Sequence, residues 1–103
     1  MWLCLRSAFL SIVAKGCDRD HLLVRARRPG DIEQVFPDAK VSRSPRGDYL
    51  YRAIILRVDI AAALAEQLKN IDYDNFKDSV GDRALHDAYL NTWATMLRLR
   101  PSP

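Results

Sequence analysis

The hydrophobic pattern of this 103-residue chain changes its period near residue 58, and this change constrains the fold most. Before it, apolar and polar residues alternate, most clearly over residues 22–28 and 49–58, which is typical of half-buried strands. After it, apolar residues recur at helical spacing, first over residues 60–70. We therefore expect a strand-rich part, residues 1–58, and a helical part, residues 59–100, within one domain over residues 1–103.

Four strands are predicted in the first part, or five if residues 2–5 form a strand of their own. Residues 8–15 are rich in strand formers, and residues 2–5 either pair with them or extend them through a bend at Arg6 and Ser7. Residues 40–44 are short and polar, as expected of an edge strand. Two strands have clear faces: Leu22, Val24 and Ala26 lie opposite Leu23, Arg25 and Arg27, and Tyr49, Tyr51, Ala53 and Ile55 lie opposite Leu50, Arg52, Ile54 and Leu56. Because both faces of residues 49–58 are partly apolar, this strand is predicted to be central.

Three helices are predicted from capping signals and apolar stripes. Asp31 is expected to cap a short helix that ends at Pro37, and Asp59 to cap a helix over residues 60–70. A third helix is expected over residues 75–99, broken or kinked at Gly81 and burying Trp93. The order of elements predicts an α+β fold: an antiparallel sheet of about four strands with helices on one face, in two layers. A ferredoxin-like variant stays open, because the sequence does not give the strand order.

Charge is distributed unevenly along the chain. Residues 1–57 carry 11 Lys and Arg against 6 Asp and Glu, whereas residues 58–103 carry 5 against 7. Twelve of the sixteen basic residues are Arg, which suits planar recognition of carboxylates or phosphates. A GC-rich genome that encodes Arg in place of Lys is the simpler explanation of this excess. The chain is therefore expected to present a basic sheet and an acidic helical flank.

The sequence carries no catalytic motif, so no enzyme activity and no cofactor are expected. Its four glycines form no phosphate-binding loop, and Cys4 and Cys17 are expected to be free thiols. Cys17 precedes His21 by four residues, the only pairing of a nucleophile with a base. Asp78, Asp82 and His86 follow one another at helical spacing, but a solvated helix flank explains them better than a metal site. No metal is expected.

Binding is the function class that remains. Residues on the faces opposite the predicted helix layer form the candidate binding surface: Leu23, Arg25, Arg27, Leu50, Arg52 and Ile54. Apolar side chains rimmed by Arg are typical of a protein interface, so we expect a protein partner. The alternatives are that Trp2 or the last helix covers this surface, or that its arginines and tyrosines bind nucleic acid. A homodimer also stays open.

No part of the sequence predicts a membrane segment. The longest apolar stretch, residues 2–14, contains Arg6 where a secretory signal would have an uninterrupted apolar core. No apolar span reaches 18 residues. We therefore expect a cytoplasmic protein that makes no contact with membranes.

Three strings resemble a family of small, uncharacterised bacterial and phage proteins. They are LLVRAR at residues 22–27, DYLYR at residues 48–52 and IDYDNFKD at residues 71–78. The resemblance implies a cytoplasmic single domain and brings no activity or site residues. Because such proteins often belong to phages or mobile elements, it suggests a regulator or a host-defence inhibitor of the anti-CRISPR type.

Overall fold

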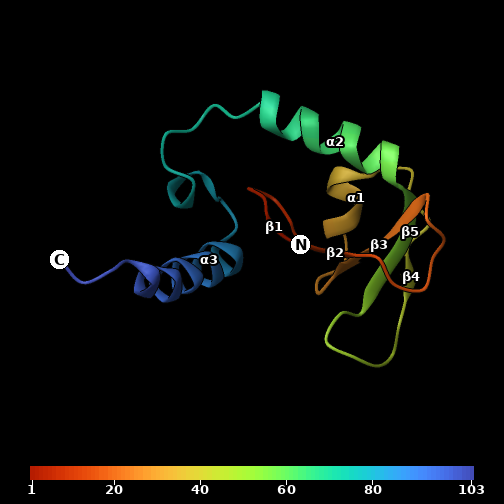
Figure 1. Ribbon diagram of the computed structural model, residues 1–103, viewed down its shortest axis with the longest axis horizontal. Coiled ribbons are helices and arrows are strands. Elements are labelled where there is room, and N and C mark those ends of the chain that lie inside the picture. Colours follow the sequence, from red (N-terminus) through yellow and green to blue (C-terminus); the bar gives the residue numbers. More distant parts are fainter.

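The computed structural model describes all 103 residues as one antiparallel sheet with three α-helices (Figure 1). The strands are β1 (Trp2–Cys4), β2 (Phe9–Val13), β3 (His21–Ala26), β4 (Ser42–Arg43) and β5 (Tyr51–Leu56). The helices are α1 (Asp31–Val35), α2 (Arg57–Lys69) and α3 (Arg83–Met96), with short 3₁₀ turns at Lys77–Ser79 and Leu97–Leu99. The predicted α+β class is confirmed. None of the helices combines the length and the apolar composition that a membrane span requires.

The sheet has the strand order β1-β2-β3-β5-β4, so α1 and β4 lie in the connection between two neighbouring strands. β1 and β2 form a hairpin in which Leu3 lies opposite Leu10, which decides between the two arrangements predicted for residues 2–5. This hairpin is why the sheet has five strands where about four were expected. β4 is an edge strand, as predicted, and β5 has a neighbour on each side.

The core lies between the sheet and two helices, α1 and α2, which both pack against the same face (Figure 1). Alternation along the strands directs one set of side chains to this face, as predicted for Val24 and Ala26. The buried cluster contains Leu10, Ile12, Val24, Ala26, Ile32, Phe36, Ala53 and Ile60. Ala63 and Leu64 of α2 pack at its margin, whereas Leu68 on the same predicted stripe is exposed.

Two helix starts differ from the prediction. α1 takes Gly30 as its N-cap, where a φ of 88° favours glycine, and Asp31 is the first helical residue. The Asp31 side chain is buried. It accepts hydrogen bonds from Arg28 and from the Phe9 N–H, which offset the cost of removing its charge from water. α2 begins at Arg57, directly after β5, so that Asp59 lies within the first turn and does not cap it. The chain passes from strand to helix without a separate loop.

The third helix is shorter than predicted. It begins at Arg83, and residues 75–82 instead contain a single 3₁₀ turn, so Gly81 lies outside the helix. Asp82 is the N-cap: its carboxylate accepts a hydrogen bond of 2.9 Å from the Leu85 N–H. Asp82, which was predicted to lie inside the helix, therefore caps its first turn.

α3 packs against the end of the β1–β2 hairpin, in a cluster separate from the main core. Val80, Leu85 and Tyr89 are buried there beside Phe9 and Phe76. The Tyr89 hydroxyl lies 2.9 Å from the carbonyl oxygens of Leu5 and of Ala8, either of which can accept its proton. Burial raises the pKa of Tyr89 far above its ordinary value. The prediction that Trp93 is buried is wrong, since it is 49% exposed.

Candidate functional site

Over β3 and β5, the sheet face opposite α1 and α2 carries no helix, and we call it the open face. α3 contacts this side of the sheet at Phe9 of β2. The strand register directs to it Ser11 and Val13 of β2, Leu23 and Arg25 of β3, and Arg52, Ile54 and Leu56 of β5. Two rows run across the strands: Ser11, Arg25 and Arg52 are neighbours in one, and Val13, Leu23 and Ile54 in the next. The open face therefore has a basic half and an apolar half.

The basic half is built around the ring of Tyr49. The guanidinium carbons of Arg25 and Arg27 lie 4.4 and 4.7 Å from its centroid, which is typical of cation–π contacts. Arg25 also donates a 2.8 Å hydrogen bond to the Ser11 hydroxyl. The Nε of Arg52 lies 3.5 Å from the Tyr49 carbonyl oxygen. Tyr49 is only 3% exposed as a result, and the arginines above it are held in defined positions.

These arginines have no acidic partner. The salt bridges of the protein involve Arg6, Arg28, Lys69 and the two histidines, and none involves Arg25, Arg27 or Arg52. In addition, Arg25 Nε is buried and has no hydrogen-bond partner. Arg25 and Arg52 lie directly opposite each other on adjacent strands, where like charges repel. The basic half thus has a positive charge that the protein does not neutralise.

The apolar half brings together part of the predicted surface. Leu23 lies between Val13 and Ile54, and these neighbours leave it only 8% exposed, so it supports the surface more than it forms it. Ile54 is 54% exposed, and Leu56 beside it is also exposed. Five of the six predicted residues therefore lie together on the open face or at its margin: Leu23, Arg25, Arg27, Arg52 and Ile54.

Leu50 precedes β5, which begins at Tyr51, so the strand register places it on neither face. The predicted grouping of Tyr49 fails. Tyr49 was predicted to share a face with Tyr51, yet its ring packs beneath Arg25 and Arg27 on the opposite side of the sheet. Burial of an aromatic ring under cations is favourable, which stabilises Tyr49 in this position. The bends in the chain before β5 allow it to leave the strand alternation.

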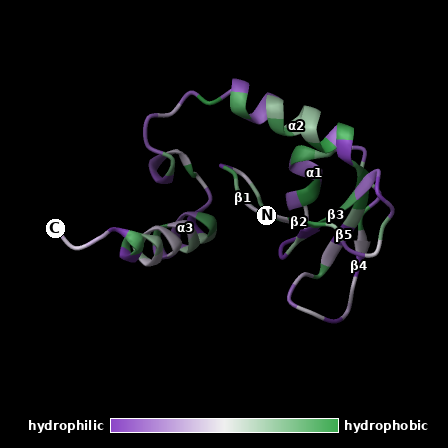
Figure 2. Ribbon diagram, viewed as in Figure 1, coloured by the Kyte–Doolittle hydropathy of each residue, from purple (hydrophilic) through white to green (hydrophobic).

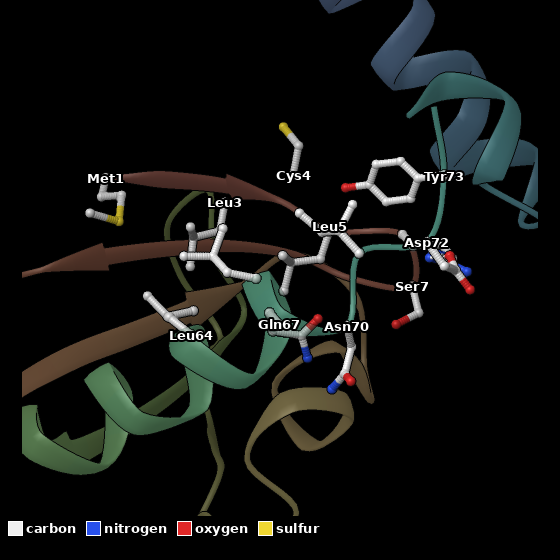
Figure 3. Close-up of a pocket in the computed structure, with 13 residues that line it drawn as sticks. Met1, Leu3, Cys4, Leu5, Ser7, Leu64, Gln67, Asn70, Asp72 and Tyr73 are labelled. Carbon is white, nitrogen blue, oxygen red and sulfur yellow. Dashed lines mark hydrogen bonds and ion pairs between the residues drawn. The ribbon is translucent and has the colours of Figure 1, made fainter. Parts of the chain in front are cut away.

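A second feature, missed in the sequence, is a cavity of about 660 Å³ between β1 and the end of α2 (Figure 3). Leu3 and Leu5 extend into it from one side and Leu64 from the other, whereas Cys4 points away. Arg6 closes one end through an ion pair with Asp72 and a cation–π contact with Tyr73. The signal that could have revealed it is the alternation of Leu3 and Leu5 on an edge strand.

The two residue groups considered for chemistry are not arranged as reactive sites. The Cys17 thiol lies 3.5 Å from the His21 carbonyl oxygen, and the His21 Nδ1 lies 2.6 Å from an Asp18 carboxylate oxygen. This hydrogen bond from His21 lowers the pKa of Asp18. The contacts of His21 therefore link its ring to Asp18 and only its backbone to Cys17.

Asp78, Asp82 and His86 also do not converge. Asp82 caps α3, and its carboxylate forms an ion pair with the Arg28 guanidinium at 3.2 Å. The His86 ring lies 3.4 Å from the Asp87 carboxylate. The hydrogen bond from the Leu85 N–H and the charge of Arg28 hold the pKa of Asp82 below its usual value. No group of three or more His, Cys, Asp or Glu side chains is close enough to hold a metal ion. Both Cys4 and Cys17 are free thiols.

Comparison with known proteins adds nothing to this geometry: the chain matches no protein-family model, no curated protein and no solved structure. The resemblance to small bacterial and phage proteins, and the role in host defence that it suggests, therefore stay predictions. The candidate site rests on the open face itself.

Proposed function

We propose that this protein is a non-enzymatic binding module whose open face recognises an acidic surface of a partner protein. One observation carries the proposal: Arg25, Arg27 and Arg52 lie without carboxylate partners beside the exposed Ile54 and Leu56. Arg and apolar residues together are enriched at protein interfaces. A carboxylate-bearing partner would supply the charges that the basic half lacks.

The arrangement of the arginines favours binding, because their side chains lose little conformational freedom when a partner binds. Contacts with Tyr49 already hold Arg25 and Arg27, so fewer rotamers are lost when a partner binds. The repulsion between the opposed Arg25 and Arg52 also falls when carboxylates approach them. Removing either arginine is therefore expected to weaken the complex more than removing a solvated lysine.

A protein partner is favoured over single-stranded nucleic acid because of the tyrosines. Sheets that bind single strands stack bases on exposed aromatic rings. Here Tyr49 is buried beneath arginines, and Tyr51 packs against the core under the helices. Nucleic acid stays the second candidate, because Trp2 is 64% exposed at the β1 edge, opposite Ser11 of the open face.

The test compares open-face variants with a matched charge reversal elsewhere. Tagged wild-type protein, Ile54→Asp, Arg27→Glu and Lys69→Glu are used to capture partners from nuclease-treated host extract, each eluted fraction being identified by mass spectrometry. Lys69 is exposed on α2, away from the open face, and is paired only with Glu66. We expect the wild type and Lys69→Glu to retain the same partner protein and both open-face variants to lose it.

Two outcomes would contradict the proposal. In the first, both open-face variants retain the partner as well as the wild type does. In the second, the wild type binds a labelled single-stranded oligonucleotide with an affinity that falls steeply with salt, Arg27→Glu abolishes this binding, and no protein is captured. The second outcome would assign the open face to nucleic acid.

A further inference from the structure

A groove of about 320 Å³ lies beside the open face, between the β1–β2 hairpin and α3. The most buried of the residues that line it are Leu85 and Tyr89, with the half-buried Phe9 next to them. These three residues also hold the helix against the hairpin, so the bottom of the groove is part of the folded core. Trp2 lines the groove from β1, and Ala88 lines it from α3.

The side chains around this groove suit an aromatic ring. Trp2 is 64% exposed, and its ring meets that of Phe9 at 77°, with the two centroids 5.7 Å apart. From the other side, α3 contributes Ala84, Ala88 and Thr92, which follow one another at successive helical turns. Their small side chains leave open the space that larger ones would fill. Because aromatic rings pack favourably against other rings, a planar apolar group fits this space best.

Three charged residues line the groove, and only one of them lacks a counter-charge. Arg28 pairs with the buried Asp31 at 3.0 Å. Arg27 forms no ion pair. Its guanidinium carbon lies 5.8 Å from the centroid of the Phe9 ring and 4.7 Å from that of Tyr49. Arg27 therefore lies between the groove and the basic half of the open face, where it can contact an anion next to a group bound in the groove.

We propose that the partner protein inserts an aromatic side chain into this groove and places the acidic residue next to it in sequence against Arg27. The inference rests on the proposed function, and it names the part of the partner that is recognised. Aromatic side chains that fill pockets are typical centres of protein interfaces. One free cation matches one carboxylate, whereas a nucleic-acid strand requires several cations along its phosphates. The helical wall offers none, since residues 88–97 are uncharged and α3 is mostly white to green there (Figure 2).

Blocked pentapeptides test this preference in NMR titrations of the ¹⁵N-labelled protein. The peptide acetyl-GEWEG-amide carries an indole ring with a carboxylate on each side, GEAEG lacks the ring, and GQWQG lacks the charges. We expect GEWEG to shift the amide signals of Phe9, Arg27 and Ala88. GEAEG should bind about tenfold more weakly because it has no anchor for the groove. GQWQG should bind about threefold more weakly because it has no partner for Arg27.

Three variants connect the peptide to the groove. Ala88→Leu fills part of the space with a residue that favours helices, so GEWEG should bind about tenfold more weakly. Ala94→Leu is the matched control, because Ala94 is exposed on the same helix and does not line the groove; it should bind GEWEG like the wild type. Arg27→Gln should bind GEWEG and GQWQG equally, since it removes the charge that distinguishes them.

The proposal is overturned by a wild-type protein that shows no shifts with GEWEG at about 5 mM. It is also overturned by Ala88→Leu binding GEWEG as tightly as the wild type does. Binding of indole-3-acetate through these residues without binding of GEWEG would assign the groove to a small molecule. Salt-sensitive binding of oligothymidylate without binding of GEWEG would assign it to nucleic acid.

Ile54→Asp separates this inference from the proposed function. Ile54 does not line the groove, so the variant should bind GEWEG like the wild type although it loses the partner protein. A wild type that captures a partner, lost in Ile54→Asp, but does not bind GEWEG would overturn the inference and leave the proposed function in place. Binding of GEWEG as expected, with a partner that Ile54→Asp and Arg27→Glu both retain, would contradict the proposed function alone.

Discussion

The sheet with its two covering helices and the third helix use hydrophobic residues in different ways. Between the sheet, α1 and α2, eight side chains are buried in one cluster. At α3, only Val80, Leu85 and Tyr89 are buried, although hydrophobic residues continue for another two turns. These further residues, Leu90, Trp93, Met96 and Leu97, are exposed. Helical spacing shows which residues share a face, but it does not show whether the same chain covers that face. The exposed part of α3 is therefore expected to contribute little to folding.

The largest expected effect is in the main core. Leu10 of β2 is completely buried in the main core, so Leu10→Ala should lower the free energy of unfolding by about 3 kcal/mol through lost transfer energy and a residual cavity. Urea titration followed by circular dichroism measures it. A loss below about 1 kcal/mol would show that this core is less tightly packed than its burial indicates.

A smaller effect is expected at Trp93, although the side chain is larger. Trp93→Ala should cost less than about 1 kcal/mol, because the residue is half exposed and Lys77 lies over one face of its ring. A loss of about 3 kcal/mol would place Trp93 in the folding core and remove the contrast between the two regions.

The smallest effect concerns the link between these regions. Arg28 pairs with Asp31 of α1 and with Asp82 at the start of α3, and Asp82→Asn removes one pair while keeping a capping side chain. The pKa of Asp82 is lowered in the folded protein, so its contribution to stability is complete above the ordinary pKa of an aspartate. This contribution is lost as the pH falls through the lower, folded-state pKa.

Urea midpoints of the wild type and Asp82→Asn measure this pH dependence. The two proteins should differ slightly near neutral pH, and the difference should vanish in strong acid. Asp74→Asn is the control, because Asp74 is exposed and forms no hydrogen bond or ion pair. A difference between the wild type and Asp82→Asn that stays constant down to strong acid would show that Arg28 and Asp82 do not interact in solution.

The parts of the fold that the sequence predicts are those decided by local pattern. Alternation placed Val24 and Ala26 in the core and Arg25 on the opposite face. It failed at Tyr49, where contact with two arginines outweighs the regular alternation of a strand. The start of α3 was missed because residues 75–82 have helical spacing, yet Asp82 caps a later start. The cavity beside β1 depends on how α2 lies over the sheet, which no local pattern contains.

Hydrogen exchange tests most directly whether α3 differs from the rest of the molecule. Amides of residues 90–96 should exchange far faster than those of β3, because few tertiary contacts hold this part of the helix. Protection of residues 90–96 as strong as that of β3 would contradict the contrast between the two regions.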